Sequence, residues 1–260
     1  MDIDYNLNKD AVNNYIKSVS KNQEEENALK KFFDVTQYIS KDEFIESLKY
    51  IISKFNVKNY AACLFTIDFE SIETKSNLWV YNLLINMGLN YPKLIIKDKN
   101  TINDAIKIGI KDFVFFDDAS YSGYQIFDTI YTRFLIEMLK LNYLDINIHI
   151  LIPFISKRAL NIFNMIVPNS IEIVPIKELS HKYTINKLIN MNNELKNKVK
   201  INFVYDKLMN QLEDILDKDV LSILTEIGIS NHDKIPIYFF HKMPDHLSSY
   251  SEIYIGFTPK

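Results

Sequence analysis

The stretch from residue 113 to residue 125 reads Phe-Val-Phe-Phe-Asp-Asp-Ala-Ser-Tyr-Ser-Gly-Tyr-Gln, and it predicts the central strand of an α/β sheet. Its four leading apolar residues do not alternate with polar ones, which is typical of a strand buried on both faces of a parallel sheet. Asp117 and Asp118 follow at the carboxyl end of that strand, where open α/β sheets bind their ligands. Two adjacent carboxylates at this place suit vicinal hydroxyls or a hydrated Mg²⁺.

The residues after the acidic pair predict a turn that leads into a helix. The turn covers residues 119–123 and ends at a glycine. An apolar pattern at helical spacing follows, at Ile126, Phe127, Ile130, Phe134 and Met138. Such a turn would point backbone N–H groups and a helix N-terminus at an anion.

Composition predicts a soluble globular protein. The 260 residues are 47% hydrophobic and 24% charged, which is ordinary for a chain that buries a core of its own. A formal net charge of -3 gives no overall attraction to nucleic acid or to anionic membranes. No apolar stretch approaches the ~20 residues that span a bilayer, and the polar first ten residues do not form a secretory signal. The single cysteine, Cys63, fits a reducing compartment, so we expect a cytoplasmic protein.

Apolar patterns divide the chain into three predicted segments. Residues 1–57 form a helical N-terminal extension, in which Ser40 begins a capping box. Residues 58–180 alternate strands and helices, which predicts an α/β core with a mainly parallel sheet. Residues 181–260 form a C-terminal addition with helical spacing at 204–227, either a hood over the site or an extra packing layer. The predicted strands cover residues 60–67, 94–96, 113–116, 146–152, 171–175, 235–240 and 253–257.

The order of an apolar strand, Asp-Asp, three residues, Ser and Gly resembles the ribose-phosphate loop of type I phosphoribosyltransferases. The resemblance implies a sheet of phosphoribosyltransferase type that binds phosphoribosyl pyrophosphate with Mg²⁺. It implies that Asp117 and Asp118 are the catalytic pair, which hold the ribose hydroxyls and a Mg²⁺ ion directly or through the substrate. The residues implied to wrap the 5′-phosphate are Ala119, Ser120, Tyr121, Ser122 and Gly123.

Two positions depart from the pattern of that family. Many members carry a small hydroxyl residue two places after the glycine, where this chain has Gln125. Members that act on purine bases often carry a carboxylate two places before the glycine, where this chain has Tyr121. These residues support ligand binding more strongly than ordinary purine-salvage chemistry, and they leave the acceptor of the phosphoribosyl group open.

Two further segments supply candidate ligand-binding residues. Lys75 and Ser76 precede the helix after the first core strand, and in the family the loop after that strand grips pyrophosphate. His241, Lys242 and Asp245 follow an apolar strand, and their segment resembles a divergent group of phosphoribosyltransferase-like proteins from bacteria and large DNA viruses. Beside the acidic pair, Lys242 would offset pyrophosphate charge and His241 would bond a phosphate or base. The alternative is a solvated loop with one structural histidine.

Three functions stay open on the sequence. The first is a Mg²⁺-dependent phosphoribosyltransferase. The second is a non-catalytic module that senses a nucleotide or phosphoribosyl ligand, and the third is a protein-interaction domain with a vestigial pocket. Acidic residues at strand ends also occur as helix caps or in the Mg²⁺ pocket of receiver-like folds, but a plain cap does not need the Ser122–Gly123 turn. Motifs of nucleoside-triphosphate loops, dinucleotide sites, zinc proteases and serine hydrolases do not occur, so those classes lose support.

Overall fold

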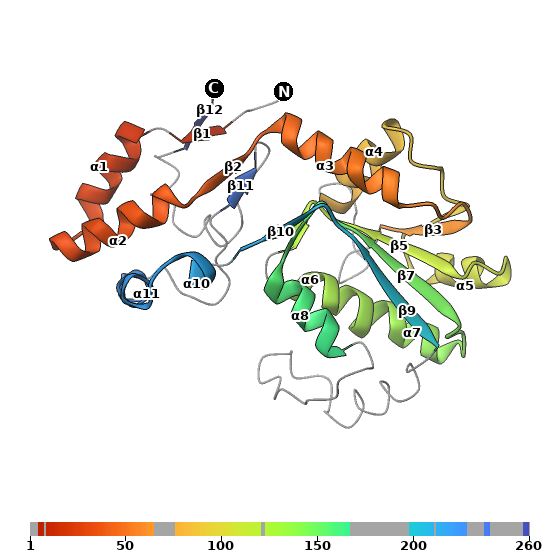
Figure 1. The fold of residues 1–260 in the computed structure, drawn as a ribbon. Coiled ribbons are helices and arrows are strands. Elements are labelled where there is room, and N and C mark those ends of the chain that lie inside the picture. Colours follow the sequence, from red (N-terminus) through yellow and green to blue (C-terminus); the bar gives the residue numbers. More distant parts are fainter. Residues whose placement is uncertain are drawn as a thin grey trace. The chain divides into compact units, whose positions relative to one another are not determined.

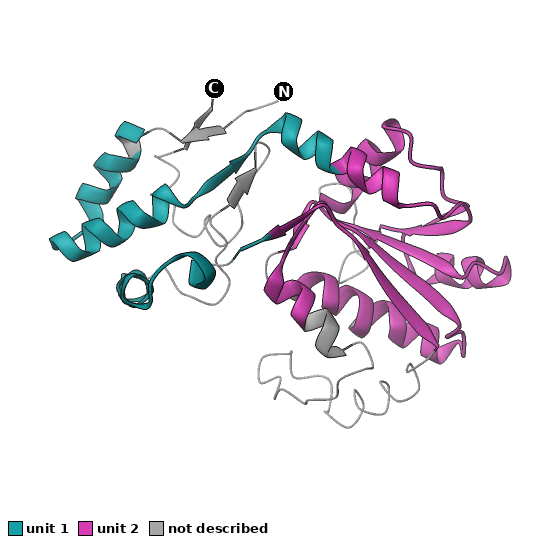
Figure 2. Cartoon of the chain, viewed as in Figure 1, with its two compact units in different colours: residues 1–47, 209–260 teal, residues 48–208 magenta. Residues whose placement is uncertain are grey.

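The chain folds into two compact units (Figure 2). The computed structural model describes residues 5–7, 9–64, 76–120, 123–166, 198–210, 212–227, 237–239 and 257–259. Residues 48–208, unit 2 in the figure, are called here the α/β unit. Residues 1–47 and 209–260, unit 1 in the figure, are called the terminal unit. The segment boundaries predicted at residues 57 and 180 both fall inside the α/β unit, and the three-segment division stays a prediction.

The α/β unit alternates strands and helices over most of its length (Figure 1). Its elements are α3 (Lys41–Lys54, which begins in the terminal unit), β3 (Tyr60–Cys63), α4 (Ser76–Asn86), β4 (Leu94–Ile96), α5 (Lys99–Lys107), β5 (Asp112–Phe116), β6 (Ala119–Ser120), α6 (Tyr124–Phe127), η1 (Asp128–Phe134), α7 (Leu135–Lys140), β7 (Ile146–Leu151), β8 (Phe154–Ser156), α8 (Lys157–Ile166), β9 (Val199–Val204) and β10 (Lys207–Met209, which ends in the terminal unit). Since α6, η1 and α7 follow one another without a gap, they form one helix whose middle part is π-helical.

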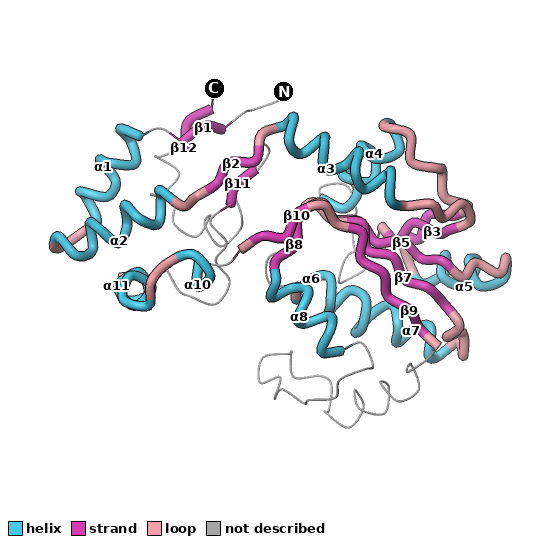
Figure 3. The backbone as a smooth tube through the Cα atoms, viewed as in Figure 1, coloured by secondary structure: helices cyan, strands magenta, loops and turns pink. Residues whose placement is uncertain are grey.

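The main sheet of the described residues has five strands in the order β4-β3-β5-β7-β9. Figure 3 labels β3, β5, β7 and β9 of this sheet. All four neighbouring pairs run parallel, and β5 lies at the centre. The chain leaves β3 for β4 on one side and returns to β5 on the other, so the strand order reverses between β3 and β5. The predicted α/β fold with a central parallel sheet is confirmed, while its phosphoribosyltransferase type stays a prediction.

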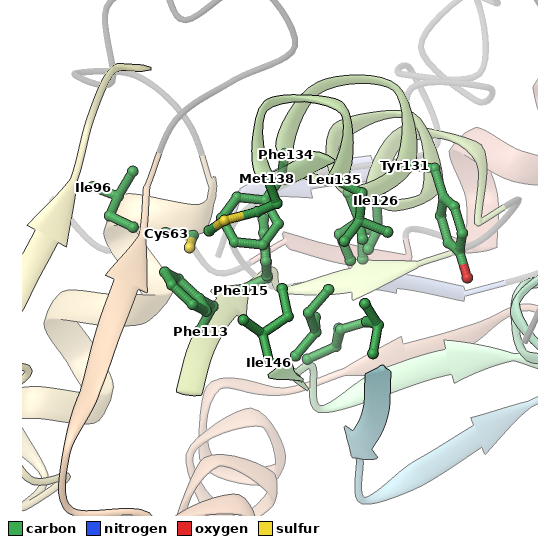
Figure 4. Packing of buried hydrophobic residues seen from close by; sticks show 14 of the residues in the cluster. Cys63, Ile96, Phe113, Phe115, Ile126, Tyr131, Phe134, Leu135, Met138 and Ile146 are labelled. Carbon is green, nitrogen blue, oxygen red and sulfur yellow. The ribbon is translucent and has the colours of Figure 1, made fainter. Parts of the chain in front are cut away.

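Alternate side chains of β5 face opposite sides of the sheet. Phe113 and Phe115 face the helix formed by α6, η1 and α7, where the ring of Phe134 lies 4.9 and 5.3 Å from theirs. Figure 4 shows Phe134 and Met138 pointing from this helix toward the strands. On the other side of the sheet, Phe116 meets Tyr81 of α4 with ring centroids 5.4 Å apart. Because both faces are covered, residues 113–116 of the strand are all apolar and buried.

The start of α3 agrees with the predicted capping box. The Ser40 hydroxyl accepts a hydrogen bond from the Glu43 amide at 3.2 Å, which satisfies one of the unpaired donors of the first turn. Phe44, Leu48 and Ile51 follow at helical spacing and are fully buried. The 3.6-residue pattern therefore identified a real helix and the face that it buries.

The outer strand β9 differs from the prediction. The sequence pattern places the end of the sheet before residue 180, yet the last strand of the sheet is Val199–Val204. The helix or helix pair predicted over residues 204–227 corresponds to two short helices, Leu212–Ile215 and Lys218–Glu226, which follow the strand Lys207–Met209. Val199 is buried, whereas Lys200 and Asn202 are exposed, so the strand alternates as a strand covered on one face does. This alternation was the feature of the sequence that could have identified the strand. The strand predicted at residues 171–175 lies outside the described residues.

The terminal unit joins the first and last segments of the chain. Its elements are β1 (Tyr5–Leu7), α1 (Lys9–Val19), α2 (Gln23–Asp34), β2 (Gln37–Ile39), α10 (Leu212–Ile215), α11 (Lys218–Glu226), β11 (Ile237–Phe239) and β12 (Phe257–Pro259). β1 pairs antiparallel with β12, and β2 pairs parallel with β11. Ile16, Phe32 and Leu224 bury themselves in one apolar cluster shared by α1, α2 and α11. None of the helices in the described part of the chain has the length and apolar composition needed to cross a bilayer.

Candidate functional site

The acidic pair lies at the carboxyl end of the central strand, as the sequence predicts. The Asp117 amide donates to the Leu151 carbonyl at 3.2 Å, so hydrogen bonding to the β7 segment continues one residue beyond β5. Both acidic residues are buried, Asp117 with 8% and Asp118 with 1% of its surface exposed. A buried carboxylate requires hydrogen-bond donors, because burial removes its hydration and an ionised group without replacement hydrogen bonds destabilises the fold.

Two backbone amides and one serine hydroxyl donate hydrogen bonds to the two carboxylates. The Asp118 amide donates to Asp117 Oδ1 at 3.0 Å, and the Ala119 amide donates to Asp118 Oδ1 at 3.0 Å. Asp117 Oδ1 also accepts a hydrogen bond of 2.7 Å from the Ser76 hydroxyl. The structure thus brings together two of the residues predicted from separate segments, Ser76 and Asp117.

Ser76 reaches the acidic pair because it begins α4 on the buried side of that helix. Val80 and Leu84 follow it at intervals of four residues and are fully buried, so the three residues lie along one face. The N-terminus of α4 therefore lies beside Asp117. Its partial positive charge favours a carboxylate there.

The loops that follow β5 and β7 are joined to each other. β6 pairs in parallel with β8, with Ala119 opposite Phe154 and Ser120 opposite Ile155. Beyond this pairing, Gly123 has a φ of 79°, and a Cβ added to it would lie 2.8 Å from the Ala159 Cα. Only glycine fits such a left-handed position at this approach. Gly123 is therefore required for the packing of the loop against α8, apart from any ligand.

The start of α8 has a structural explanation of its own. The Ser156 hydroxyl accepts a hydrogen bond from the Ala159 amide at 2.8 Å, which caps the helix. Ser120, on the paired strand β6, is 6% exposed. Ser120 and Ser156 are therefore buried hydroxyl residues on the paired strands β6 and β8.

Several predicted site residues lie outside the described residues. Their placement relative to Asp117 stays a prediction. These residues are Lys75, Tyr121, Ser122, His241, Lys242 and Asp245.

A second polar cluster, which sequence reasoning missed, lies at the amino end of β5. Asp112 Oδ1 accepts a hydrogen bond of 3.0 Å from Asn147 Nδ2, and it lies 2.9 Å from His149 Nε2. His149 is buried and meets the edge of the Phe55 ring at a centroid distance of 5.5 Å. Asn147 and His149 are two residues apart in a strand, so they share a face; that spacing was the signal in the sequence.

Comparison of the chain with protein-family models, with curated proteins and with solved structures finds no match. Function is therefore inferred from the chemistry of the acidic loop and its neighbours. Two carboxylates beside a hydroxyl and a helix N-terminus can accept hydrogen bonds from vicinal hydroxyls or share a hard cation with a ligand.

Proposed function

We propose that this protein binds phosphoribosyl pyrophosphate, or a related ribose 5-phosphate ligand, with Mg²⁺ at the carboxyl end of β5, and that it transfers the phosphoribosyl group to an acceptor. The observation that carries the proposal is the position of Asp117 and Asp118 at the end of the central strand. This end adjoins the reversal of strand order between β3 and β5, where doubly wound sheets bind ligands. The resemblance of residues 117–123 to a ribose-phosphate loop supplies the class of ligand.

In the proposed reaction, the acidic pair acts on the ribose. Asp117 and Asp118 accept hydrogen bonds from its 2′- and 3′-hydroxyls. The bond between C1′ and the pyrophosphate oxygen breaks, and its electron pair leaves with pyrophosphate. The negative carboxylates stabilise the positive charge that develops on the sugar, and the acceptor then forms its bond at C1′. Catalysis comes mainly from this positioning and charge stabilisation.

The donor set fits Mg²⁺ that is shared with a substrate. Mg²⁺ binds one or two carboxylates and completes its shell with water and phosphate oxygens. Among the described residues, no three His, Cys, Asp or Glu side chains are grouped to hold a metal ion, so Asp117 and Asp118 would hold it with substrate and water. When bound, the ion supplies neutralisation of the pyrophosphate charge.

In the proposal, the segments next to the acidic pair bind the phosphate groups of the ligand. In this proposal the turn over residues 119–123 binds the 5′-phosphate through backbone amides other than that of Ala119, which donates to Asp118 Oδ1. Lys75, His241 and Lys242 are the proposed partners of pyrophosphate or of the base, and Asp245 belongs to the same C-terminal loop.

A second candidate is a non-catalytic module that senses the same ligand. Gln125 favours it, because many members of the family that the loop resembles carry a small hydroxyl residue at that position. Tyr121 also favours it, since relatives that act on purines often have a carboxylate there. Such a module would bind the ligand and leave it intact.

Two measurements on one protein separate these candidates. Titration calorimetry with phosphoribosyl pyrophosphate and Mg²⁺ measures binding, and pyrophosphate release in the presence of a panel of bases and amines measures transfer. Binding with acceptor-dependent release supports the transferase. Binding without release across the panel supports the sensing module, and absence of both rejects the proposed ligand.

A further inference from the structure

The geometry points to Ser76 as a positioning residue that holds the Asp117 carboxylate in place, an inference that rests on the ligand site proposed above. The Ser76 hydroxyl donates to Asp117 Oδ1 at 2.7 Å across 41 residues of sequence. A serine has one hydroxyl proton to donate, and a phosphate oxygen can only accept. Because Asp117 takes that proton, Ser76 serves the ribose through Asp117 and does not donate to the pyrophosphate.

The packing of α4 makes this hydrogen bond rigid. Tyr81 of α4 meets the ring of Phe116 at a centroid distance of 5.4 Å, and Ser76 of α4 bonds Asp117. One helix thus contacts two consecutive residues at the end of β5. A donor held by a packed helix keeps its partner within the narrow range of geometry that a binding site requires.

Two donors on one oxygen define the orientation of the Asp117 carboxylate. Asp117 Oδ1 accepts from the Ser76 hydroxyl at 2.7 Å and from the Asp118 amide at 3.0 Å. The amide is part of the same loop as Asp117, whereas the hydroxyl comes from a different helix. Removal of the hydroxyl takes away the hydrogen bond that ties the carboxylate to α4.

The test uses the full chain and two ligands that represent the two ends of the proposed substrate. Titration calorimetry measures ribose 5-phosphate and, separately, inorganic pyrophosphate, each with Mg²⁺. Ser76→Ala is compared with Ser76→Thr, which keeps a hydroxyl. Ser53→Ala is the matched control, because it removes a 2.6 Å hydroxyl bond to the Tyr50 carbonyl on an exposed helix surface.

For Ser76→Ala we expect ribose 5-phosphate to bind roughly tenfold more weakly, as the loss of one hydrogen bond to a charged group implies. Pyrophosphate affinity should stay within about twofold, and Ser76→Thr and Ser53→Ala should bind both ligands like the parent. A loss confined to pyrophosphate would make Ser76 a phosphate contact and overturn the inference. Unchanged affinity for both ligands would overturn it as well.

A measurement without ligand keeps this inference separate from the proposed function. The melting temperatures of Ser76→Ala, Asp117→Ala and the double variant form a double-mutant cycle. We expect the double variant to lose less than the sum of the single losses, because both single changes break the same bond. Additive losses would overturn the positioning role even if the parent binds ribose 5-phosphate. If the parent binds neither ligand, the proposed function fails and the cycle alone decides whether Ser76 holds Asp117.

Discussion

The two ends of β5 each carry an acidic residue, and different parts of the fold hold the two carboxylates. At the amino end, Asp112 Oδ1 meets Asn147 and His149, which both belong to the neighbouring strand β7. At the carboxyl end, Asp117 Oδ1 meets Ser76 of α4 and the amide of Asp118. Asp112 is thus held by side chains of the sheet, whereas Asp117 is held by hydrogen bonds from the start of a helix and from its own loop. The first arrangement is typical of structural support, and the second lies where α/β sheets bind ligands.

The largest expected effect concerns the two glycines that flank β5. Gly109 and Gly123 have φ angles of 73° and 79°, but an added Cβ meets nothing within 4 Å at Gly109 and lies 2.8 Å from the Ala159 Cα at Gly123. We expect Gly109→Ala to cost about 1 kcal/mol of unfolding free energy from backbone strain alone. Gly123→Ala adds a clash with backbone and should cost about 2–4 kcal/mol.

Denaturant unfolding of both glycine variants measures this difference. Equal losses would mean that α8 shifts away from the loop without cost. The close packing inferred between the loop after β5 and the start of α8 would then be wrong.

An intermediate effect is expected at the amino end of β5. Asp112→Ala leaves Asn147 and the buried His149 without their shared acceptor, which should cost about 1–3 kcal/mol. Asp112→Asn keeps an oxygen acceptor at the same place, so its stability should be closer to that of the parent than the stability of Asp112→Ala. Thermal and denaturant unfolding check both variants. A stability of Asp112→Ala equal to that of the parent would remove the structural role assigned to this end.

The smallest effect concerns Asp98, which shows how a purely structural acid behaves at a strand end. Asp98 follows β4, is exposed, and accepts a hydrogen bond of 2.9 Å from the Thr101 amide as the cap of α5. The bond to that amide holds the pKa of Asp98 below its ordinary value of 3.8. Because the pKa is lowered in the folded state, the ionised Asp98 carboxylate stabilises the fold above pH 3.8. This stabilisation disappears as the pH falls through the folded-state pKa.

Asp98→Ala should therefore have a slightly lower melting temperature than the parent near neutral pH. The difference should shrink in acid, as melting curves at several pH values below 5 would show. A difference that stays constant down to pH 2 would contradict a charged cap.

Local patterns in the sequence predicted the part of the fold that positions the site. The unalternated run Phe113–Phe116 identified a strand covered on both faces, and the rule for open sheets placed Asp117 at its ligand-binding end. Ser76 was predicted as a pyrophosphate contact, because the family that the chain resembles grips pyrophosphate with the loop after the first core strand. The structure adds the atoms involved, a hydroxyl and one carboxylate oxygen.

Contacts between distant segments could not be predicted. β1 pairs with β12 and β2 with β11, and such short strands carry no local mark of a partner at the other end of the chain. The Asp112 cluster depends on the register that places Asp112 opposite Asn147, which composition does not reveal. β9 was missed because Lys200 and Asn202 interrupt its apolar residues.

Titration calorimetry with phosphoribosyl pyrophosphate and Mg²⁺ tests the central claim most directly, on the parent, the double variant Asp117→Asn/Asp118→Asn and the amino-end control Asp112→Asn. We predict that the parent and the control bind alike. The double variant should lose about 1.5–3 kcal/mol for each charge-assisted contact, while its melting temperature without ligand stays close to that of the parent, since asparagine keeps an oxygen acceptor. Equal affinity of the parent and the double variant would contradict the assignment of the carboxyl end of β5 as the ribose-phosphate site.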